Sequence, residues 1–483
     1  MKHLTFNGGY QFNFRGAPSA EVVDVSVGES LRFDLDAGTV TWVCEVAQGA
    51  HVDAFAVLAR AKDAPEVCFV SPVAGTVARV VVGAAGSDEG GKVASAELGA
   101  SDGAAGFVEV TPDDASATTS PEGMALDGSW SDQRNEARAA VARAGLWWRI
   151  RDGFTGAVAG LDDSPEQVIV RGLFTEPFFP VEEQLAVERS DALVRGLEVL
   201  DKLAGQQAPA LVVVRQGMPK ELSELVKVKS VEIVEAPARY PAENPQFLDG
   251  LLAGWSGRGS GRTWVIDLQD VLRLGDLATT GVYDVREYVA LAGEGLSKPS
   301  HAMVFPGSSI SHVLSGDRAV SGKGPVRVLL GGMLTGKSVS LDGWVTPGTR
   351  SVVVVPEHQK RRFLGFLAPG LDEDSFSYGF LSNLAPGHAR GAHAGLRGQV
   401  RYCISCSYCE WVCPVGLNPQ TLWKLGDIGE VEEAASQGLM RCIGCGLCSY
   451  VCPAKIELTA DLKRSQEQYR QMLAEEEAAA GAA

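Results

Sequence analysis

Hydrophobic and polar residues follow different periods in different parts of the chain. Up to about residue 110, short Val-rich runs lie between Gly turns, a pattern typical of β-strands. Three such runs are EVVDVSVGE (21–29), TVTWVCEVAQG (39–49) and FVSPVAGTVARVVVG (69–83). A stretch rich in Ser, Thr, Asp and Gly follows and predicts a linker or long loop. We therefore expect a β domain over residues 1–115 and a linker over residues 116–136.

Strand and helix patterns alternate over residues 137–295. The predicted strands are VIVRGLF (168–174), ALVVVRQG (210–217), SVEIVEA (230–236) and TWVIDLQD (263–270). The predicted helices are VERSDALVRGLEVLDKLAG (187–205) and AENPQFLDGLLAGW (242–255). Such alternation predicts an α/β sheet domain.

Short β runs return over residues 296–395. They are AMVFPG (302–307), VRVLLGG (326–332) and SVVVVPE (351–357), with Gly turns between them. A cysteine-rich segment follows over residues 396–464, and a helix rich in Gln, Glu and Ala with a short tail fills residues 465–483. The sequence therefore predicts a multidomain α/β and β protein with a helical C-terminal part.

Composition narrows the class of protein. The chain has 483 residues, 45% of them hydrophobic, and a formal net charge of -17. This length predicts about three to five domains. The negative charge argues against nucleic-acid binding and against electrostatic anchoring on a membrane. The polar start carries no signal-peptide pattern, and no apolar run is long enough to span a bilayer, so we expect a cytoplasmic protein that reaches a membrane only through partners.

The most specific signal is a cysteine spacing that occurs twice. The pattern C-x2-C-x2-C-x3-C-P appears as CISCSYCEWVCP (403–414) and again as CIGCGLCSYVCP (442–453). This run binds [4Fe-4S] clusters, and in two-cluster ferredoxins the fourth cysteine ligates the other cluster. We therefore predict two clusters, with the following ligands. The first set is Cys403, Cys406, Cys409 and Cys452, and the second set is Cys442, Cys445, Cys448 and Cys413.

A zinc site and a disulfide framework are the alternatives. Zinc sites use paired C-x2-C knuckles and need neither a third cysteine nor the following proline. Disulfides need an oxidising compartment and are typical of small secreted chains. Two neighbouring clusters instead predict electron transfer. Whether the fourth ligands are exchanged between the runs stays open at this point.

The turn SPVAGTV (71–77) resembles the second half of a biotinyl or lipoyl domain. In that interpretation Lys62 would carry a swinging arm. Pro65 and the wide spacing to the turn favour a carrier-like sandwich that serves as a scaffold.

The segment GGMLTGKS (331–338) matches the phosphate-binding pattern G-x4-G-K-[ST] and follows a predicted strand. A P-loop must open into a helix, whose N-terminus faces the phosphates. The next residues, VSLDGWVTPGT (339–349), contain Gly343, Pro347 and Gly348 and predict no helix. We therefore interpret Lys337 and Ser338 as turn residues.

No G-x-G-x-x-G opens a helix in the α/β domain. The nearest candidate, at 142–154, has Trp147 and Trp148 where a pyrophosphate cradle needs glycine, so we expect no own FMN or NADH. Cys44 and Cys68 lie in apolar β runs and are expected to be small core residues. The aromatic residues near the clusters are expected to pack around them: Tyr402, Tyr408, Trp411, Trp423 and Tyr450.

Two families resemble this chain in different parts. Residues 1 to about 395 resemble NqrA, the first component of the Na+-translocating NADH:quinone oxidoreductase (the Nqr complex). The matching stretches are RGAP (15–18), FVSPVAGTV (69–77), AGLWWRIRDGF (144–154), DLQDVLRLGDLATTGVYDVREYVALAG (267–293) and FLGFLAPGLDEDSFS (363–377). The last fifth resembles RnfC of the Rnf complex, the ion-translocating ferredoxin:NAD oxidoreductase, through the double cysteine run and SYVCPAKIEL (449–458).

The resemblance implies four domains in this order: a barrel-sandwich hybrid (1–115), a Rossmann-like α/β domain (137–295), a β-grasp domain of the ligand-binding type (296–395) and a helical two-[4Fe-4S] domain (396–464). Typical NqrA proteins lack the double cysteine run, and typical RnfC proteins have a Gly-rich NADH and FMN site that this chain lacks. The resemblance thus leaves the electron donor and acceptor open.

These observations predict a peripheral cytoplasmic subunit of an Nqr- or Rnf-type membrane complex, in which Na+ is the expected ion. Its clusters would pass single electrons between a redox partner, on the NADH/quinone or ferredoxin side, and the membrane subunits. The chain would be an electron carrier within an ion-translocating oxidoreductase, and the Nqr resemblance allows a bound quinone. The alternatives are a soluble Fe–S oxidoreductase without a membrane complex, a biotin or lipoyl carrier, and a protein in which the clusters serve only assembly.

Overall fold

The fold is taken from a computed structural model of the chain. The structure describes residues 2–35, 40–82, 106–119, 133–205, 208–217, 230–252, 254, 261–322, 324–357, 374–376, 384, 387–392 and 400–481. Most of the predicted linker and most of the stretch 363–377 lie outside these residues. Within the described part of the chain, no helix is both long enough and apolar enough to cross a membrane.

The N-terminal part holds two small antiparallel sheets. The first has the order β3 (Leu31–Asp34), β9 (Phe107–Pro112), β8 (Gly75–Val81), β5 (His51–Val52). The second has the order β4 (Trp42–Cys44), β6 (Val57–Ala61), β7 (Ala64–Val70). Alternate residues face the core, as in β3, where Leu31 and Phe33 are buried and Arg32 is half-buried.

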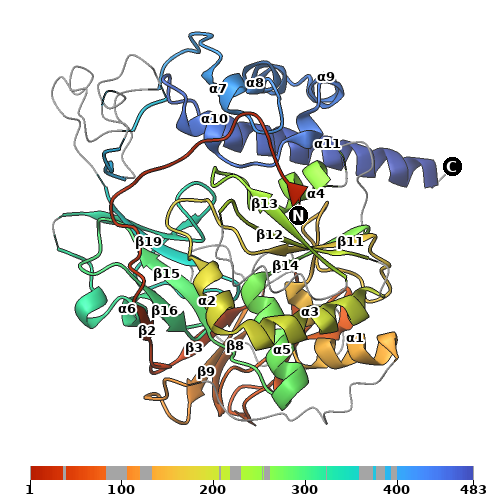
Figure 1. Cartoon of the computed structure of the whole chain (residues 1–483), viewed down its shortest axis with the longest axis vertical. Helices are drawn as coiled ribbons and strands as arrows, with labels where there is room; N and C mark the ends of the chain where they lie inside the picture. The colour runs from red at the N-terminus through yellow and green to blue at the C-terminus, as the bar shows by residue number, and fades with distance from the viewer. Residues whose placement is uncertain are drawn as a thin grey trace.

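The first residues of the chain contribute to other sheets. Strand β1 (Lys2–His3) pairs in parallel with β13 (Val231–Ala236), and β2 (Val22–Asp24) pairs in parallel with β16 (Ser300–Val304). Between them the N-terminal segment crosses the molecule next to the C-terminal helices, drawn in red and blue in Figure 1. The N-terminal segment therefore links three parts of the protein.

A six-stranded sheet forms the α/β part. Its order is β1, β13, β12 (Ala210–Arg215), β11 (Gln167–Arg171), β14 (Thr263–Asp267), β10 (Arg151–Asp152), with β10 antiparallel to β14 and the other pairs parallel. Around it lie α1 (Arg134–Arg143), η2 (Trp147–Arg149), α2 (Glu182–Glu188), α3 (Ser190–Ala204), α4 (Pro245–Leu252) and α5 (Leu268–Thr280). The four strands and two helices predicted from the sequence are present, but the strand predicted over 263–270 ends at Asp267, and residues 268–270 begin α5 instead.

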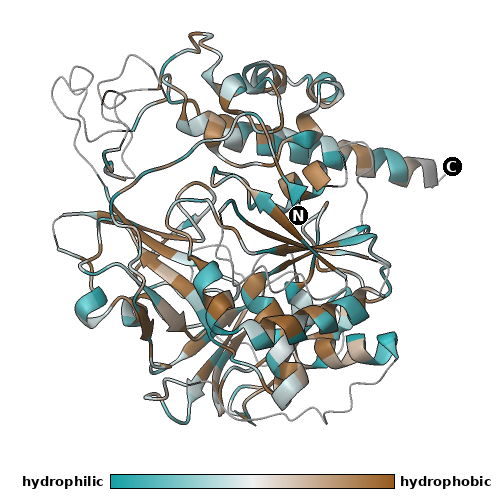
Figure 2. Ribbon diagram, in the orientation of Figure 1, coloured by the Kyte–Doolittle hydropathy of each residue, from teal (hydrophilic) through white to brown (hydrophobic). Residues whose placement is uncertain are grey.

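Alternate side chains of this sheet enter two different cores. Val168 and Val170 of β11 pack with α3 and α5, whereas Ile169 packs with Leu248 of α4 on the other face. Figure 2 shows the strands as hydrophobic ribbons between these layers. Helices α3 and α5 approach so closely that a Cβ on Gly196 would collide with the Val271 carbonyl oxygen. Burial on both faces explains why the strands read as continuous apolar runs.

A second six-stranded sheet, of mixed direction, follows. Its order is β18 (Lys337–Val339), β17 (Val326–Leu330), β19 (Ser351–Pro356), β15 (Glu287–Ala292), β16, β2. The short α6 (Ile310–Val313) covers one face, where Ile310 packs with Val352 and Val354. On the other face Val353 packs with Phe178 of the α/β part.

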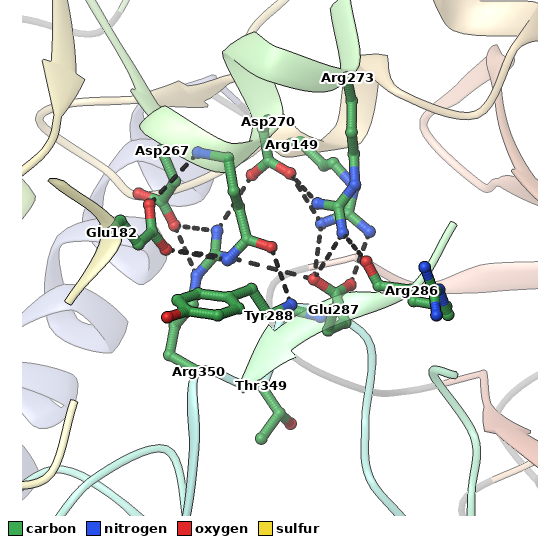
Figure 3. A network of polar contacts seen from close by, with 12 residues as sticks. Arg149, Glu182, Asp267, Asp270, Arg273, Arg286, Glu287, Tyr288, Thr349 and Arg350 are labelled. Carbon is green, nitrogen blue, oxygen red and sulfur yellow. Dashed lines mark hydrogen bonds and ion pairs between the residues drawn. The ribbon is translucent and has the colours of Figure 1, made fainter. Parts of the chain in front are cut away.

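A buried ionic network joins the two large sheets (Figure 3). Arg149 contacts Asp270 at 3.1 Å and Glu287 at 2.7 Å. Arg350 donates to Asp267 at 2.9 Å and contacts Asp270 at 3.1 Å. Each carboxylate in this network faces a guanidinium group, which offsets the cost of burying charge.

The C-terminal part is helical. It contains α7 (Tyr408–Val412), α8 (Pro419–Asp427), α9 (Val431–Ser436), η7 (Leu439–Arg441), α10 (Leu447–Tyr450) and the long α11 (Leu458–Gly481). Helix α8 begins where the Asn418 side chain accepts the Thr421 N–H at 3.2 Å, with Pro419 in the first turn. The core of the C-terminal part also contains Phe247 of α4, so the helical part packs directly on the α/β part.

Candidate iron–sulfur site

Two loops with the same spacing and the same backbone form the candidate site. We call residues 403–413 the outer loop and residues 442–452 the inner loop. In the outer loop Ser405 and Ser407 have φ values of 54° and 59°, and the corresponding Gly444 and Gly446 have 62° and 85°. The left-handed conformation costs a non-glycine residue about 1–2 kcal/mol. Its recurrence at matched positions shows that both loops curl in the same way, and only the two serines of the outer loop bear this cost.

The first predicted set of cysteines surrounds one cavity. Cys403, Cys406 and Cys409 of the outer loop and Cys452 at the end of the inner loop all line it. Apolar side chains, including Ile404, Ile456 and Leu458, complete the wall. The fourth cysteine therefore comes from the other run.

The second predicted set gathers on the inner side. The pKa of the Cys445 thiol is raised well above its ordinary value, by burial first and then by Cys448, Cys442 and Cys413. Burial raises the pKa of Cys448 to about 12, and Cys442 and Cys413 add to the rise. Cys413, from the end of the outer loop, thus lies with the three inner-loop cysteines.

Backbone N–H groups point at several sulfur atoms. The Ser405 N–H donates to Cys403 Sγ at 3.4 Å, and the Leu417 N–H donates to Cys413 Sγ at 3.4 Å. Hydrogen bonds from Gly444 and Leu447 oppose the effect of burial on Cys442 and Cys445. Donors aimed at sulfur stabilise thiolates and tune the potential of a cluster that they bind.

These features are the ones expected of cysteines that bind iron–sulfur clusters. Neighbouring buried thiols with raised pKa values ionise only when a positive group replaces their protons, and iron supplies that charge. Among the described residues, no group of three or more His, Cys, Asp or Glu side chains is close enough to hold a single metal ion. A cubane differs from a single ion because each of its four irons takes its own thiolate.

The surroundings of the two loops differ strongly. Tyr402 and Ile404 of the outer region are 96% and 65% exposed, whereas Leu447 of the inner loop is fully buried. Trp411 is 58% exposed. The expectation that aromatic residues pack around the clusters is therefore wrong for Tyr402, whereas Trp411 contacts the Tyr408 ring, with centroids 5.9 Å apart, and stays partly exposed.

The other aromatic residues do pack. Tyr450 donates its hydroxyl to Asp374 at 2.6 Å, and Trp423 donates to Asp461 at 3.0 Å. Tyr408 makes an edge contact with Phe376, with ring centroids 5.5 Å apart.

The rest of the protein contacts the inner loop at two points and the end of the outer loop at one. The Tyr240 hydroxyl donates to the Cys445 carbonyl oxygen at 2.5 Å. A Cβ added to Gly446 would lie 3.2 Å from the Leu334 carbonyl oxygen. From the N-terminal segment, the Gly9 N–H donates to the Val412 carbonyl oxygen at 2.8 Å. Sequence patterns did not reveal these residues, because their partners lie more than one hundred positions away.

The segment 331–336 makes a turn, and a strand follows it in place of a helix, as the missing P-loop helix predicts. The interpretation of Lys337 and Ser338 as turn residues is wrong, because both lie in β18 and pair with Leu330 and Leu329 of β17.

The backbone donors of the turn over 331–336 are occupied by this chain. The N–H groups of Leu334 and Thr335 both donate to Glu176 Oε1 at 2.8 Å, and the Thr335 hydroxyl donates to Glu176 Oε2 at 2.6 Å. A glycine-rich loop that suits an anion thus holds a carboxylate.

The other residues singled out from the sequence lie in the β and α/β parts. Lys62 is exposed in the two-residue turn between β6 and β7, so it does occupy a hairpin tip despite the spacing that argued against a carrier. Cys68 is buried as expected, and Cys44 is half-buried with its thiol 3.3 Å from the Val46 carbonyl oxygen. Trp147 and Trp148 are core residues.

Comparisons with known proteins agree with both parts of the chain. Residues 132–283 match the family model of the NqrA second alpha/beta domain, and residues 399–456 match the model of a 4Fe-4S dicluster domain. These matches confirm the resemblance to NqrA and the dicluster domain at the C-terminus.

Curated relatives share most of their length with this chain. The NqrA protein of the Na(+)-translocating NADH-quinone reductase of Rhodopirellula baltica is 25% identical over 381 residues, which cover 78% of each chain. Its counterpart in Vibrio vulnificus YJ016 is 24% identical over 440 residues, 90% of this chain and 92% of the relative. These relatives are subunits of an oxidoreductase complex.

Among solved structures, an NAD+-reducing [NiFe]-hydrogenase in the H2-reduced state aligns over 70% of this chain and 65% of its own. The TM-score is 0.40 and the identity 13%. A likeness of this size supports no statement about fold or function.

Proposed function

We propose that this chain is the electron-transfer subunit of an Nqr-type, ion-translocating oxidoreductase, Na+ being the expected ion. Two [4Fe-4S] clusters, one in each set of cysteines, pass single electrons between a redox partner and membrane subunits. The NqrA relatives and the dicluster match support the complex and the chemistry. The likeness of the C-terminal part to RnfC rests on the cysteine runs and the residues that follow them.

The observation that carries the proposal is the position of the fourth cysteine of each run, which lies with the first three cysteines of the other run. Cys452 lines the outer cavity, and Cys413 lies with the inner cysteines. Exchanged ligands place two cubanes in one small domain, as in two-cluster ferredoxins. A single cluster would leave four further cysteines gathered without a role.

This chain supplies the surroundings of the clusters. The thiolates hold the irons, backbone N–H groups donate to sulfur, and the inner loop is shielded from water by Leu447 and Tyr240. Bound clusters accept and release one electron at a time. Because exposure and hydrogen bonding set their potentials, the clusters of the outer and inner loops should have different potentials.

In this proposal the remaining domains hold the cluster-binding domain in position. We assign the small antiparallel sheets to a barrel-sandwich hybrid, the parallel sheet to a Rossmann-like domain and the second large sheet to a β-grasp domain. In this proposal the chain lies on the cytoplasmic face of the membrane, held by partner subunits. A quinone is the organic ligand that the Nqr relatives suggest.

Metal analysis tests the central claim. Anaerobically purified protein should contain about eight irons and eight acid-labile sulfides per chain, as two cubanes require. A content near four of each would refute the two-cluster proposal. Purification from membranes in mild detergent tests the setting: recovery without any membrane subunit would favour the soluble oxidoreductase.

A further inference from the structure

Two buried carboxylates lie between the α/β part and the inner loop without a cation. Glu176 and Glu243 are 5% and 4% exposed. Glu243 Oε1 accepts the Glu176 N–H at 2.7 Å, and its Oε2 accepts the Thr175 hydroxyl. Within the described chain neither carboxylate forms an ion pair, and the donors to Glu176 are the neutral groups of Leu334 and Thr335. We call these two residues the carboxylate pair.

The ionic network in Figure 3 provides the contrast. There Glu287 is also buried, but Arg149 and Arg273 contact it at 2.7 and 3.2 Å. Burial opposes its ionisation, and the guanidinium groups outweigh burial, so the pKa of Glu287 lies well below the ordinary value. The carboxylate pair has no such compensation. Two uncompensated carboxylates near each other in an apolar setting cannot both stay ionised at little cost.

Burial accordingly raises the pKa of Glu243 to about 7, with the Thr175 hydrogen bond opposing this rise and the Glu176 charge adding to it. Burial also raises the pKa of Glu176, against the hydrogen bonds from Thr335 and Leu334. Burial without a cation thus favours a proton on this pair, with the pKa of Glu243 near neutral.

The pair is connected to the inner loop through two residues. Tyr240, whose hydroxyl donates to the Cys445 carbonyl oxygen at 2.5 Å, has a pKa raised by burial and then by Glu176, Cys445 and Glu243. Leu334, whose N–H binds Glu176, lies against Gly446. Charge on the carboxylate pair and charge at the inner loop therefore act on the same group.

The remaining charged groups around the pair are accounted for. Arg171 of β11 donates to the backbone oxygen of Glu243 at 3.2 Å, and its own charge is paired with Asp267 at 2.5 Å. From the loop between β17 and β18, Thr335 is the side chain that faces Glu176, and it carries no charge. In the described parts of these elements, no cationic side chain forms an ion pair with either carboxylate.

We propose that the carboxylate pair of Glu176 and Glu243 is a redox-linked proton site, which binds one proton when the inner cluster is reduced. One electron enters the cluster from the one-electron donor of the complex, and one proton moves from solvent to a carboxylate oxygen, where an O–H bond forms. Oxidation of the cluster returns both. This inference rests on the proposed function, because it requires a cluster held by the inner loop.

The physical reason is charge compensation. Reduction adds a negative charge to a cluster that burial separates from water, and in a medium of low dielectric constant that charge is costly. A proton taken up by a nearby carboxylate offsets it. The outer loop is reached by solvent, so its cluster has less need of such a proton.

Potentiometric titration with dithionite, followed by EPR, tests the proposal in the full-length protein. The signal that remains in Cys403→Ala is assigned to the inner cluster. Its midpoint potential should fall as the pH rises from about 6 to 8, with a ceiling of about 59 mV per pH unit for a one-electron couple. The outer cluster should change much less. A flat inner potential in protein with about eight irons would overturn the proton site and leave the proposed function intact, whereas absence of the inner cluster would overturn both.

Variants locate the proton. Glu243→Gln and Glu176→Gln should each flatten the pH dependence, because an amide keeps the shape but takes up no proton. The matched control is Glu188→Gln, an exposed residue on α2 that should leave the slope unchanged. A slope that persists in both pair variants would place the proton elsewhere and refute the proposal.

A measurement on the unmodified protein guards against variants that fail to fold. Reduction should produce a carboxylic acid C=O band in the infrared difference spectrum, and D2O should shift that band. Its absence in protein whose clusters are fully reduced would also refute the proposal.

Discussion

The outer and inner loops share one spacing and one backbone conformation, yet they meet very different surroundings. Three of the residues that bend them are Ser405, Gly444 and Gly446, all with positive φ. The outer loop keeps serine where the inner loop has glycine. At Gly446 the body approaches closely, since a Cβ would meet the Leu334 carbonyl oxygen at 3.2 Å. The comparison indicates that both loops need the left-handed turn, whereas the close approach of Leu334 favours glycine at position 446 of the inner loop.

The largest expected effect is the loss of one cluster's EPR signal when the fourth cysteine of a run is replaced. If the fourth cysteines cross between the loops, Cys452→Ala should lose the same EPR signal as Cys403→Ala, and Cys413→Ala the same signal as Cys445→Ala. Each variant should retain about half of the iron. The opposite pairing, in which Cys452→Ala resembles Cys445→Ala, would show that each run binds its own cluster.

The next effect concerns the contact between the N-terminal segment and the end of the outer loop. Gly8 has a φ of 67°, and a Cβ on it would lie 2.5 Å from the Cys413 carbonyl oxygen. Gly8→Ala should lower the free energy of unfolding by about 3 kcal/mol, because overpacking adds to backbone strain. Thermal unfolding measures it.

Gly49→Ala is the control for Gly8→Ala. Gly49 has a φ of 82° with nothing within 4 Å of its Cβ position, so only the backbone cost of about 1–2 kcal/mol remains. Equal losses in both variants would mean that the N-terminal segment does not press on the cluster domain.

A pH-dependent effect separates the carboxylate pair from the ionic network. The folded-state pKa of Glu243 is about 7 and its ordinary value is 4.5, so its stabilising contribution is complete below pH 4.5 and is lost as the pH rises through 7. Glu243→Gln should match the parent near pH 4.5 and exceed its stability at pH 8 by up to about 3 kcal/mol. Denaturant unfolding at both pH values measures the difference, and a variant that is less stable at pH 8 would contradict it.

The smallest expected effect lies on the exposed side of the comparison. Tyr402→Ser should change the free energy of unfolding by less than about 0.5 kcal/mol, because Tyr402 is 96% exposed. A loss of more than about 1 kcal/mol would mean that the outer loop is covered as well as the inner one.

Local patterns predicted most of the elements. Val and Ile runs bounded by turn residues gave strands β11, β12, β13 and β14, and the cysteine spacing gave the candidate ligands. The same sequence hid what distant segments do together. Glu176, Tyr240 and Leu334 lie close together in space, but nothing in their local sequences marks them as neighbours. A charged residue in a helical or strand pattern looks solvent-exposed, so the buried network around Asp270 and Glu287 could not be predicted either.

Two expectations about side chains illustrate the same limit. Exposure of Tyr402 and Trp411 depends on where the body ends, which no local pattern encodes. Lys62 lies at a hairpin tip because Ala61 pairs with Ala64. Intact mass analysis of purified protein reveals whether that lysine carries an adduct.

The N-terminal segment sets an order on how this protein matures. Gly8 and Gly9 contact residues Val412 and Cys413, which the ribosome makes some four hundred positions later. Strands β1 and β2 can pair with β13 and β16 earlier, but the contacts of Gly8 and Gly9 form only after the cysteine-rich end has been made. Under the proposed function, iron and sulfide would shape the loop that these two glycines contact, so a shortage of either should leave the last contacts of the N-terminal segment unformed.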